Sequence, residues 1–248
     1  MTKPKVVASI EARMGSSRLP GKILYDINGQ PAIERLVNRL KLCKEIDEII
    51  IATTDKEGDN KLAEWALQNQ LHVFRGSEED VLNRVVNAQK SLQSDIVVEI
   101  TGDCILLDPN IIDLGVRTYL ANDFDVVTNA RIASYAQGLD VQVYSLEKLE
   151  YVEKNIEDPA VREHVSLFFY ENPSLYTICN MIAPPQWERP QLRLQLDYQE
   201  DLMLIRELYK RIEPKCGYSF GVEKIIEELN SNPELEKINS SCIEKAVR

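Results

Sequence analysis

The sequence is poor in cysteine, and its cysteines form no pairing pattern. The five cysteines among 248 residues are scattered and odd in number, and no Cys-x-x-Cys motif occurs. A disulfide framework and a cysteine-rich zinc site are therefore not expected. An apolar signal-peptide core at the N-terminus and an apolar run long enough to span a bilayer are also absent from the sequence. We expect a reduced, cytoplasmic protein with no membrane partner.

Positive charge is in deficit as well. Lys and Arg number 29 against 40 Asp and Glu, which gives a formal net charge of −11. A negative field over most of the surface repels phosphate, so we expect no nucleic-acid partner. A polyphosphate ligand would instead need a local basic pocket and a divalent cation. Hydrophobic residues make up 44% of the chain, enough to build the core of one large α/β domain or two small ones.

One loop concentrates the scarce cations. It follows the apolar run at residues 6–10, which predicts a buried strand. The loop contains three cations, two glycines and two serines: Arg13, Arg18, Lys22, Gly15, Gly21, Ser16 and Ser17. Glycines allow close backbone approach to a ligand, while amides and hydroxyls bind phosphate oxygens. We favour a polyphosphate loop over the alternative, a basic loop that is merely solvated.

Two well-known phosphate motifs do not fit this loop. The P-loop of ATPases needs four residues between its glycines, whereas five separate Gly15 from Gly21, and Ile23 stands where the magnesium-binding hydroxyl belongs. The dinucleotide fingerprint G-x-G-x-x-G is absent too. The loop therefore belongs to another class of phosphate site.

Short apolar runs alternate with amphipathic helical stretches through the first half of the chain. Strands are expected at residues 6–10, 48–53, 71–74 and 95–100, and helices at residues 33–42, 61–68, 80–92 and 109–120. Repeated βα units predict a mostly parallel sheet that is covered on both faces. Later strands are expected at residues 138–144, 176–182 and 192–196, with helices at residues 146–170 and beyond residue 201. We expect one domain, residues 1–248, with a small β-rich insertion at about residues 128–198.

Two aspartates follow expected strands and are candidate metal ligands. Asp103 follows the strand at residues 95–100, and Asp197 follows the one at residues 192–196. Ligands of open α/β sheets bind beyond the carboxyl ends of the strands, and Gly102 permits close backbone approach there. Two carboxylates can hold one Mg²⁺ together with phosphate and water. For each aspartate alone, a helix cap or a turn is the alternative, and Asp108 before Pro109 is expected to be such an N-cap.

The chain resembles a known family through motifs in a fixed order. Residues 12–22, 74–82, 101–104 and 138–141, extended by residues 162–165 and 196–202, resemble the SpsF-type cytidylyltransferase family of spore-coat polysaccharide biosynthesis, which is related to the CMP-Kdo and CMP-sialic acid synthetases. The resemblance implies a Rossmann-like, GT-A-type α/β fold. It also implies Mg²⁺-dependent transfer of CMP from CTP to a small anionic acceptor in surface polysaccharide biosynthesis, with release of pyrophosphate.

The resemblance also assigns residues to roles. Lys22, Asp103 and Asp197 are the expected catalytic residues, the two aspartates being the metal ligands. The nucleotide is expected to contact Ala12, Arg13, Gly15, Ser16, Ser17, Arg18, Lys22, Thr54, Asp55, Arg75, Gly76 and Gly102. Thr54 and Asp55 end the second expected strand, and their roles stay open between reading the base or ribose and capping the next helix.

The acceptor is expected to meet eight residues: Asn129, Arg131, Tyr135, Asp140, Gln142, Arg162, His164 and Arg193. His164 is expected at the polar start of a helix, where pairing with Glu163 on the helix surface is the alternative. The family pattern has Arg, Pro and Glu at positions 99, 105 and 142, where this chain has Glu99, Ile105 and Gln142. These departures leave the metal and triphosphate residues intact but bear on the acceptor pocket. An acidic sugar of the Kdo or sialic type leads, and a phosphorylated or phosphonate metabolite is the runner-up.

Other functions on a similar sheet remain as alternatives. One is a metal-dependent glycosyltransferase that uses a nucleotide-sugar, and another is a non-catalytic nucleotide-binding subunit. The basic loop favours a triphosphate donor over both. Apolar faces of the helical tail beyond residue 201 could pack on the sheet or on a second copy of the chain, and a homodimer is expected.

Overall fold

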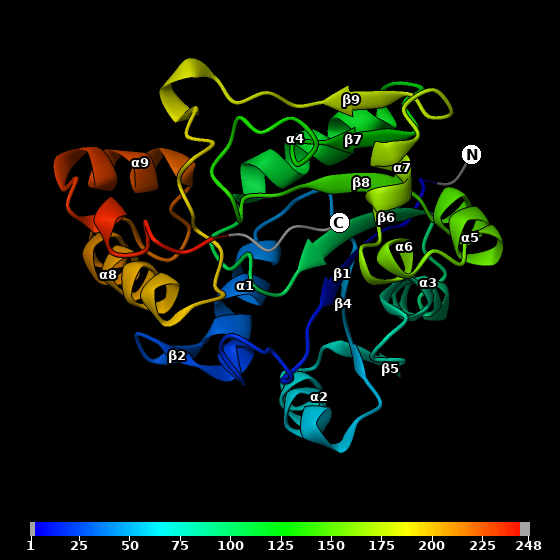
Figure 1. The fold of residues 1–248 in the computed structure, drawn as a ribbon, viewed down its shortest axis with the longest axis horizontal. Helices are drawn as coiled ribbons and strands as arrows, with labels where there is room; N and C mark the ends of the chain where they lie inside the picture. The colour runs from blue at the N-terminus through cyan, green and yellow to red at the C-terminus, as the bar shows by residue number, and fades with distance from the viewer. Residues whose placement is uncertain (1–2, 244–248) are drawn as a thin grey trace.

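A seven-stranded sheet forms the centre of the protein (Figure 1), whose computed structural model describes residues 3–243. Its strands are β1 (Val6–Glu11), β4 (Glu48–Thr54), β5 (His72–Gly76), β6 (Ile96–Thr101), β7 (Val126–Thr128), β8 (Gln142–Ser145) and β9 (Ile178–Asn180). They lie in the order β5-β4-β1-β6-β8-β7-β9, and only the two pairings that involve β8 are antiparallel. The expected α/β fold with a mostly parallel sheet is confirmed.

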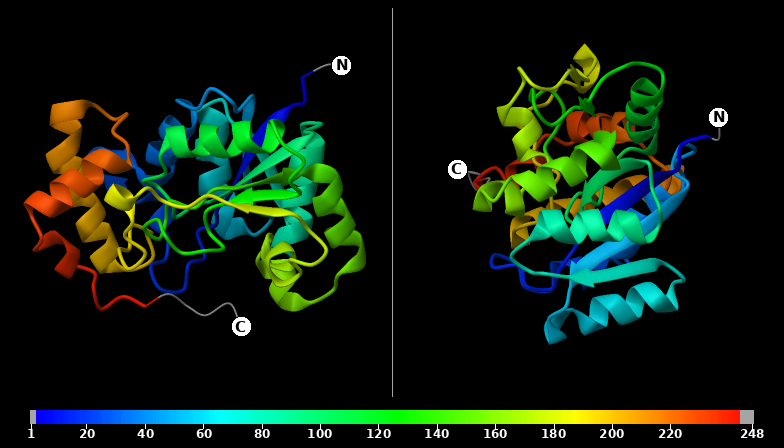
Figure 2. Two further views of the ribbon diagram at one scale, coloured as in Figure 1. Left: turned by 90° about the horizontal axis from the view of Figure 1, so that it is seen from above. Right: turned by 90° about the vertical axis from the view of Figure 1, so that its right-hand side faces the viewer.

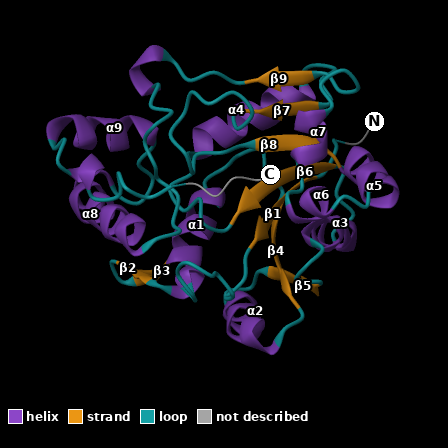
Figure 3. Ribbon diagram, in the orientation of Figure 1, coloured by secondary structure: helices purple, strands orange, loops and turns teal. Residues whose placement is uncertain are grey.

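Helices cover both faces of this sheet (Figures 2 and 3). They are α1 (Ala32–Leu40), α2 (Asn60–Gln68), α3 (Val81–Ser91), α4 (Pro109–Leu120), α5 (Leu146–Asn155), α6 (Pro159–Glu163), α7 (Leu167–Glu171), α8 (Gln199–Cys216) and α9 (Val222–Ser231). Apolar residues of α3, α5, α6 and α7 pack on one face, and those of α1, α2 and α4 pack on the other, in a core that continues to α8 and α9 beyond the end of the sheet (Figure 1). A hairpin of β2 (Asp26–Ile27) and β3 (Gln30–Pro31) lies outside the main sheet.

Strand β1 shows why the sequence reads as a buried run. Val6, Ala8 and Ile10 belong to the core under α1 and α4, whereas Val7 belongs to the core under α3. Since successive side chains of a strand point to opposite faces, a strand covered on both sides is apolar throughout. Glu11 ends the strand at its carboxyl edge, where the basic loop begins.

The strand expected at residues 192–196 is wrong. The segment is extended, but it forms only an isolated bridge between Arg193 and Gln137. The Gln137 amide donates to the Leu192 carbonyl (2.9 Å) and the Leu194 amide donates to the Gln137 carbonyl (2.8 Å). A single partner residue does not make a ladder, so alternating apolar residues here serve packing rather than a strand.

The strand expected at residues 138–144 begins only at Gln142, because residues 138–141 follow an irregular course. Gly138 has φ +89°, and a Cβ there would lie 2.7 Å from the Gln195 nitrogen. Only glycine permits this approach, which brings the extended segment alongside. The segment continues to the site, where the Leu196 amide donates to the Asp103 carbonyl (3.0 Å).

Several other expectations can be compared with the structure. Asp108 is the N-cap of α4, accepting from the Asn110 amide (2.8 Å), as expected from its place before Pro109. Helices α8 and α9 account for most of the expected helical tail, while residues 244–248 lie outside the described residues. Within residues 3–243, no helix combines the length and apolar character needed to cross a membrane.

Candidate active site

Three charged side chains from distant parts of the sequence meet beyond the sheet. Lys22 begins the 3-10 helix η1 (Lys22–Leu24), Asp103 follows β6, and Asp197 precedes α8. The Lys22 Nζ lies 2.9 Å from Asp103 Oδ2 and 2.6 Å from Asp197 Oδ1. The structure thus brings together the three residues that were assigned to catalysis, with the ammonium between the two carboxylates.

Asp197 is surrounded by cations. Arg18 and Arg193 donate to its Oδ2 at 2.6 and 3.0 Å, while Lys22 takes Oδ1. Burial acts to raise the pKa of Asp197, but the charge and hydrogen bond of Lys22 and the hydrogen bond of Arg18 hold that pKa at about 2. Conversely, burial acts to lower the pKa of Lys22, and the two aspartates raise it. Asp197 and Lys22 are therefore both charged at neutral pH.

The remaining sides of Asp197 are occupied by residues that sequence reasoning did not single out. Asp201, which is fully buried, accepts from the Asp197 amide (3.0 Å) and from Arg193 Nε (3.1 Å). The Asn239 side chain donates to Asp201 Oδ1 (2.8 Å). Asp201 was visible in the sequence as part of the Asp-x-x-Glu-Asp-Leu pattern, whereas Asn239 carried no signal.

The backbone of the basic loop is anchored by a residue from another element, while several of its side chains are exposed. The Met14 amide donates to Asp59 Oδ1 (2.6 Å), a buried carboxylate that sequence reasoning also missed. Arg13, Ser17 and Arg18 are exposed residues, and Arg13 makes a surface ion pair with Glu78 (3.1 Å). Exposed cations and amides around a fixed backbone are what a loop needs to receive phosphate oxygens.

The residues expected at the edges of this loop differ in role. Ser16 is half-buried, and its hydroxyl accepts from the Leu19 amide (3.4 Å). Gly15 is exposed and faces the Glu78 carboxylate. The Gly102 amide donates to the Glu11 carbonyl (2.9 Å), and a Cβ at Gly102 would meet that oxygen and the buried Ala12. The close approach at Gly102 is thus to the backbone of β1.

The expected base-contacting residues form a self-contained turn. Thr54 is buried, and its hydroxyl and amide donate to Asp59. Arg75 donates to the Thr54 carbonyl (2.9 Å), to the Lys56 carbonyl (2.7 Å) and to Asn60 (2.7 Å). The Thr54 hydroxyl also accepts from the Lys56 amide (3.3 Å), so its side chain holds this turn together and caps neither the 3-10 helix η2 (Glu57–Asp59) nor α2.

Asp55 and Gly76 lie on the same turn. The Asp55 amide donates to the Gly76 carbonyl (2.9 Å), which extends the pairing of β4 with β5 by one bond. Asp55 is exposed and Gly76 half-buried.

The expected acceptor residues fall into groups, the first of which lies where β7 ends and β8 begins. Asn129 is buried and clamps the chain, donating to the Leu139 carbonyl (2.8 Å) and accepting from the Val141 amide (2.6 Å). Asp140 is half-buried between them. After burial, the charges of Asp103 and Asp140 raise the pKa of Cys104.

The second group consists of cations that the protein itself uses. Arg162 donates to the Glu153 carbonyl (2.7 Å) and lies 3.4 Å from Asp80, the N-cap of α3. Arg193 is 5% exposed and is held by Asp197 and Asp201. His164 is the C-cap of α6, so its expected place at the start of a helix is wrong.

The remaining two expected acceptor residues before β8 differ in exposure. Arg131 is exposed. Tyr135 is 7% exposed and lines a cavity of about 300 Å³ with Trp187 and Leu114. Burial raises the pKa of Tyr135, and the charge of Asp108 adds to this effect. Its hydroxyl is therefore neutral at physiological pH.

Two of the three positions that depart from the family pattern belong to one buried network, while the third, Ile105, lies in the hydrophobic core. Glu99 and Gln142 are partners in the β6–β8 register, and the Ser166 hydroxyl contacts a side-chain oxygen of each. Tyr144 donates to Glu99 (2.5 Å), and Tyr170 donates to Gln142 (2.8 Å). Burial raises the pKa of Glu99 although these hydroxyls act to lower it. Since Ser166 has one hydrogen for two oxygens, a protonated Glu99 supplies the missing donor.

Replacing Glu99 with glutamine is expected to stabilise the protein increasingly as the pH rises. Because the folded-state pKa of Glu99 is raised, its contribution is fully present below the unfolded pKa and is lost as pH rises through the folded pKa. Glutamine stays neutral, so the variant avoids this loss, which amounts to about 1.4 kcal/mol for each tenfold change in proton affinity. Urea unfolding between about pH 5 and about pH 8 measures the difference. A difference that does not change over this range would contradict a raised pKa.

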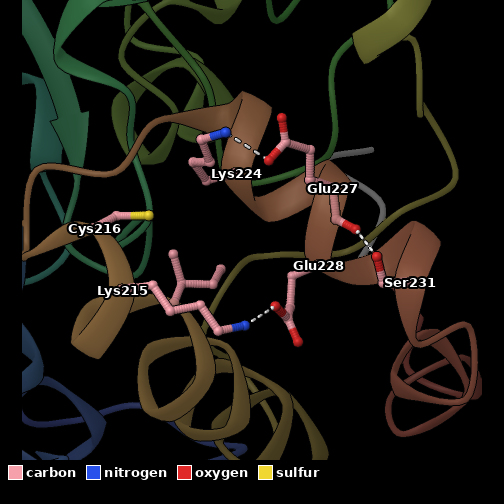
Figure 4. Close-up of a pocket in the computed structure, with 7 residues that line it drawn as sticks. Lys215, Cys216, Lys224, Glu227, Glu228 and Ser231 are labelled. Carbon is pink, nitrogen blue, oxygen red and sulfur yellow. Dashed lines mark hydrogen bonds and ion pairs between the residues drawn. The ribbon is translucent and has the colours of Figure 1, made fainter.

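A second cavity, of about 280 Å³, lies between α8 and α9 (Figure 4). Its charged side chains pair with each other: Lys215 with Glu228 (3.0 Å) and Lys224 with Glu227 (2.6 Å). The Ser231 hydroxyl donates to the Glu227 carbonyl (2.9 Å). Because these polar groups are paired with one another, we favour the basic loop over this cavity as the candidate active site.

The donor set of the loop site can be tested against a metal ion. No cluster of three or more His, Cys, Asp and Glu suited to a metal occurs among the described residues. Asp103 and Asp197 do converge on one cation, the Lys22 ammonium, so the space between them accommodates positive charge. Two carboxylates leave positions for phosphate and water, as Mg²⁺ prefers. The residues fit a metal that arrives with a nucleotide.

Comparison with known proteins points to the family that the sequence motifs resemble. A cytidylyltransferase family model matches residues 7–234. The spore coat polysaccharide biosynthesis protein SpsF of Bacillus subtilis (strain 168) is 31% identical over 232 residues, which cover 91% of this chain and 94% of that protein. The structure of a cytidylyltransferase from Leptospira borgpetersenii serovar Hardjo-bovis (strain JB197) matches with a TM-score of 0.90 and 31% identity, covering 98% of this chain and 100% of that chain.

A more distant structure shares the fold. CMP:2-keto-3-deoxy-manno-octonic acid synthetase complexed with CTP matches with a TM-score of 0.62 and 18% identity, covering 84% of this chain and 99% of that chain. The expected nucleotidyltransferase fold is thereby confirmed.

Proposed function

The chain belongs to the cytidylyltransferase family and is a nucleotidyltransferase, and from this premise we propose that it transfers CMP from CTP to a small anionic acceptor, with Mg²⁺ as its metal and pyrophosphate as the second product. The observation that carries the proposal is the arrangement of Asp103, Lys22 and Asp197 beside an exposed basic loop. The expected relation to SpsF and CMP-Kdo synthetases supports CTP as the nucleotide, since one structural neighbour was solved with CTP.

The proposed reaction depends on positioning and charge more than on covalent chemistry. The acceptor oxygen attacks the α-phosphorus while the bond to pyrophosphate breaks. Held by Asp103 and Asp197, Mg²⁺ supplies charge neutralisation and orientation at the phosphates. Arg13, Arg18 and Lys22 stabilise the negative charge that develops on the leaving pyrophosphate. An acceptor that is already a phosphate or phosphonate needs no general base, whereas a sugar hydroxyl does.

The acceptor in this proposal is an acidic sugar of the Kdo or sialic type, in surface polysaccharide biosynthesis in the cytoplasm. A phosphorylated or phosphonate metabolite is the runner-up. Arg131 is the exposed cation of the expected acceptor set, while Arg162 and Arg193 are engaged by carboxylates. We also propose a homodimer, supported by the exposed apolar residues Ile132 and Ile182 in the insertion. Light scattering of the purified protein tests the dimer.

A thermal-shift panel tests the nucleotide. With Mg²⁺ present, CTP is expected to raise the melting temperature more than UTP, GTP, ATP or dTTP at equal concentration. A ligand at about 100 times its Kd stabilises the folded state by about 2.7 kcal/mol, which such a scan resolves readily. Stabilisation by a purine nucleotide alone would overturn CTP. A subsequent pyrophosphate-release screen with CTP and both acceptor types identifies the acceptor, and activity with only neutral, unphosphorylated sugars would overturn the anionic class.

A further inference from the structure

The last described segment of the chain lies along the loop that carries Asp197. Leu235 of this segment is buried in the main core. Beyond it, Asn239 donates to the Arg193 carbonyl (3.0 Å), and the Ile243 carbonyl accepts from the Tyr198 hydroxyl (3.1 Å). Figure 1 shows this segment in red, running from α9 back toward the centre of the molecule. Residues 235–243 therefore form a strap, a term used here for this segment alone.

Through Asn239, the strap reaches the carboxylate in two steps. Asn239 donates to Asp201 Oδ1, and Asp201 Oδ2 accepts from the backbone amides of Asp197 (3.0 Å) and Tyr198 (2.9 Å). Arg193 joins both acids, with Nε 3.1 Å from Asp201 and a terminal nitrogen 3.0 Å from Asp197. Asp201 thus holds the backbone of Asp197, and Arg193 holds its side chain.

Because this network is buried, the loss of any one member leaves its hydrogen-bond partners unpaired. The exposed fractions are 5% for Arg193, 4% for Asp197, 0% for Asp201 and 3% for Asn239. Water cannot readily replace a hydrogen bond that is lost there, so the remaining partners must shift or stay unpaired.

Position 239 requires two hydrogen-bond donors on one group. The Asn239 amide nitrogen donates both to a carboxylate and to a backbone carbonyl. An aspartate of the same size would present acceptors to acceptors, and an alanine would present nothing. A replacement at position 239 must therefore match both the size of asparagine and its two hydrogen-bond donors.

We propose that Asn239 is a positioning residue of the active site, which fixes the Asp197 carboxylate for the metal through Asp201 and Arg193. The inference rests on the proposed function, which assigns Asp197 to the metal. The strap also connects to the basic loop through Tyr198, whose hydroxyl donates to the Ile243 carbonyl. The Arg18 guanidinium lies 5.1 Å from the centre of the Tyr198 ring, and the Arg193 guanidinium lies 5.6 Å from it. The strap therefore completes a site whose other parts lie in the first 201 residues.

The test measures metal binding in the full chain, without an acceptor. Mn²⁺ is titrated into the protein with saturating CTP, and free Mn²⁺ is followed by electron paramagnetic resonance. Asn239→Ala and Asn239→Asp are expected to weaken Mn²⁺ binding by about 10-fold or more, the range seen when partners of metal ligands are lost. Asn239→Ser, which keeps one donor, is expected to lie between these variants and the natural protein.

Two controls separate positioning from general stability. Asn232→Ala removes a second asparagine near the C-terminus, a half-buried one that donates to Glu228 (2.9 Å) and accepts from Arg211 (3.1 Å) and, within residues 3–243, has no hydrogen bond to the Asp197 network. It is expected to lower the melting temperature and leave Mn²⁺ affinity unchanged. CTP binding in EDTA is expected to change little in the Asn239 variants, since they alter the metal side of the site.

The outcomes distinguish the inference from its premise. If Asp197→Ala binds Mn²⁺ as tightly as the natural protein, the metal role of Asp197 in the proposed function is wrong. If Asp197→Ala weakens Mn²⁺ binding while all folded Asn239 variants bind normally, the positioning role is wrong. Equal Mn²⁺ affinity of Asn239→Asp and the natural protein would reduce Asn239 to a packing residue.

Discussion

Replacing Asp103 or Asp197 with asparagine is expected to lower pyrophosphate release from CTP by about 100-fold or more. Partners of metal ligands already cost about 10–100-fold when they are lost, and a ligand itself should cost at least as much. Each substitution keeps the size of the side chain but removes a charge that faces Lys22. The rate is measured against Mg²⁺ concentration with an acceptor found by the pyrophosphate-release screen.

Asp108→Asn is the matched control for these two variants. Asp108 is buried near Asp103 in sequence, but its carboxylate accepts from the Asn110 and Val222 amides, both at 2.8 Å. Asparagine can still cap α4 through its one side-chain oxygen, but its NH2 group cannot accept from the buried Val222 amide, so the variant is expected to lose about 1–3 kcal/mol of stability without a change in the Mg²⁺ requirement. If Asp103→Asn and Asp197→Asn both kept the natural rate at limiting Mg²⁺, the assignment of two metal aspartates would be wrong.

The parallel half of the fold could be predicted because its signal is local. A strand such as β1, buried on both faces, is a nearly continuous apolar run that only Ser9 interrupts before Glu11 ends it. The start of a helix such as α4 can be predicted from Asp108 and Pro109. Residues 192–196 show the limit of this reasoning. Their alternation reflects burial, whereas a strand also needs a partner along its whole length, and the irregular course around Gly138 offers only Gln137. Whether a partner strand is present cannot be predicted from the sequence of residues 192–196 alone.

The candidate site also has a part that could be predicted from the sequence and a part that could not. The basic loop and Asp103 follow strand ends in sequence, so the expectation that they meet at one edge follows from the topology of parallel sheets. Arg193 and Arg162 were expected to face an acceptor because they are cations near the site. Their carboxylate partners, Asp201 and Asp80, come from other elements and are known only once the chain is folded. Asn239 is the extreme case, since its whole role lies in tertiary contacts.

Removing Lys22 or Arg18 is expected to weaken binding of CTP far more than binding of CMP. Both cations lie in the basic loop and both contact Asp197, so they stand where phosphates and metal would converge. A lost charge-assisted hydrogen bond is worth about 1.5–3 kcal/mol, which corresponds to about 10–150-fold in affinity. Isothermal titration calorimetry of Lys22→Ala and Arg18→Ala with each nucleotide in Mg²⁺ measures the two losses.

Lys224→Ala provides the control, because it removes an equal charge from a surface pair with Glu227 in the other cavity. It should leave both affinities unchanged, which would show that the net charge of the protein is not the cause. Lys22→Ala should also raise the pKa of Asp197, since Lys22 is the foremost of the groups that oppose burial and hold that pKa low. The Mg²⁺-dependent affinity for CTP should then fall at a higher pH on acidification than in the natural protein. Equal losses for CTP and CMP would place Lys22 and Arg18 away from the β- and γ-phosphates, and the leaving-group role would pass to Arg13.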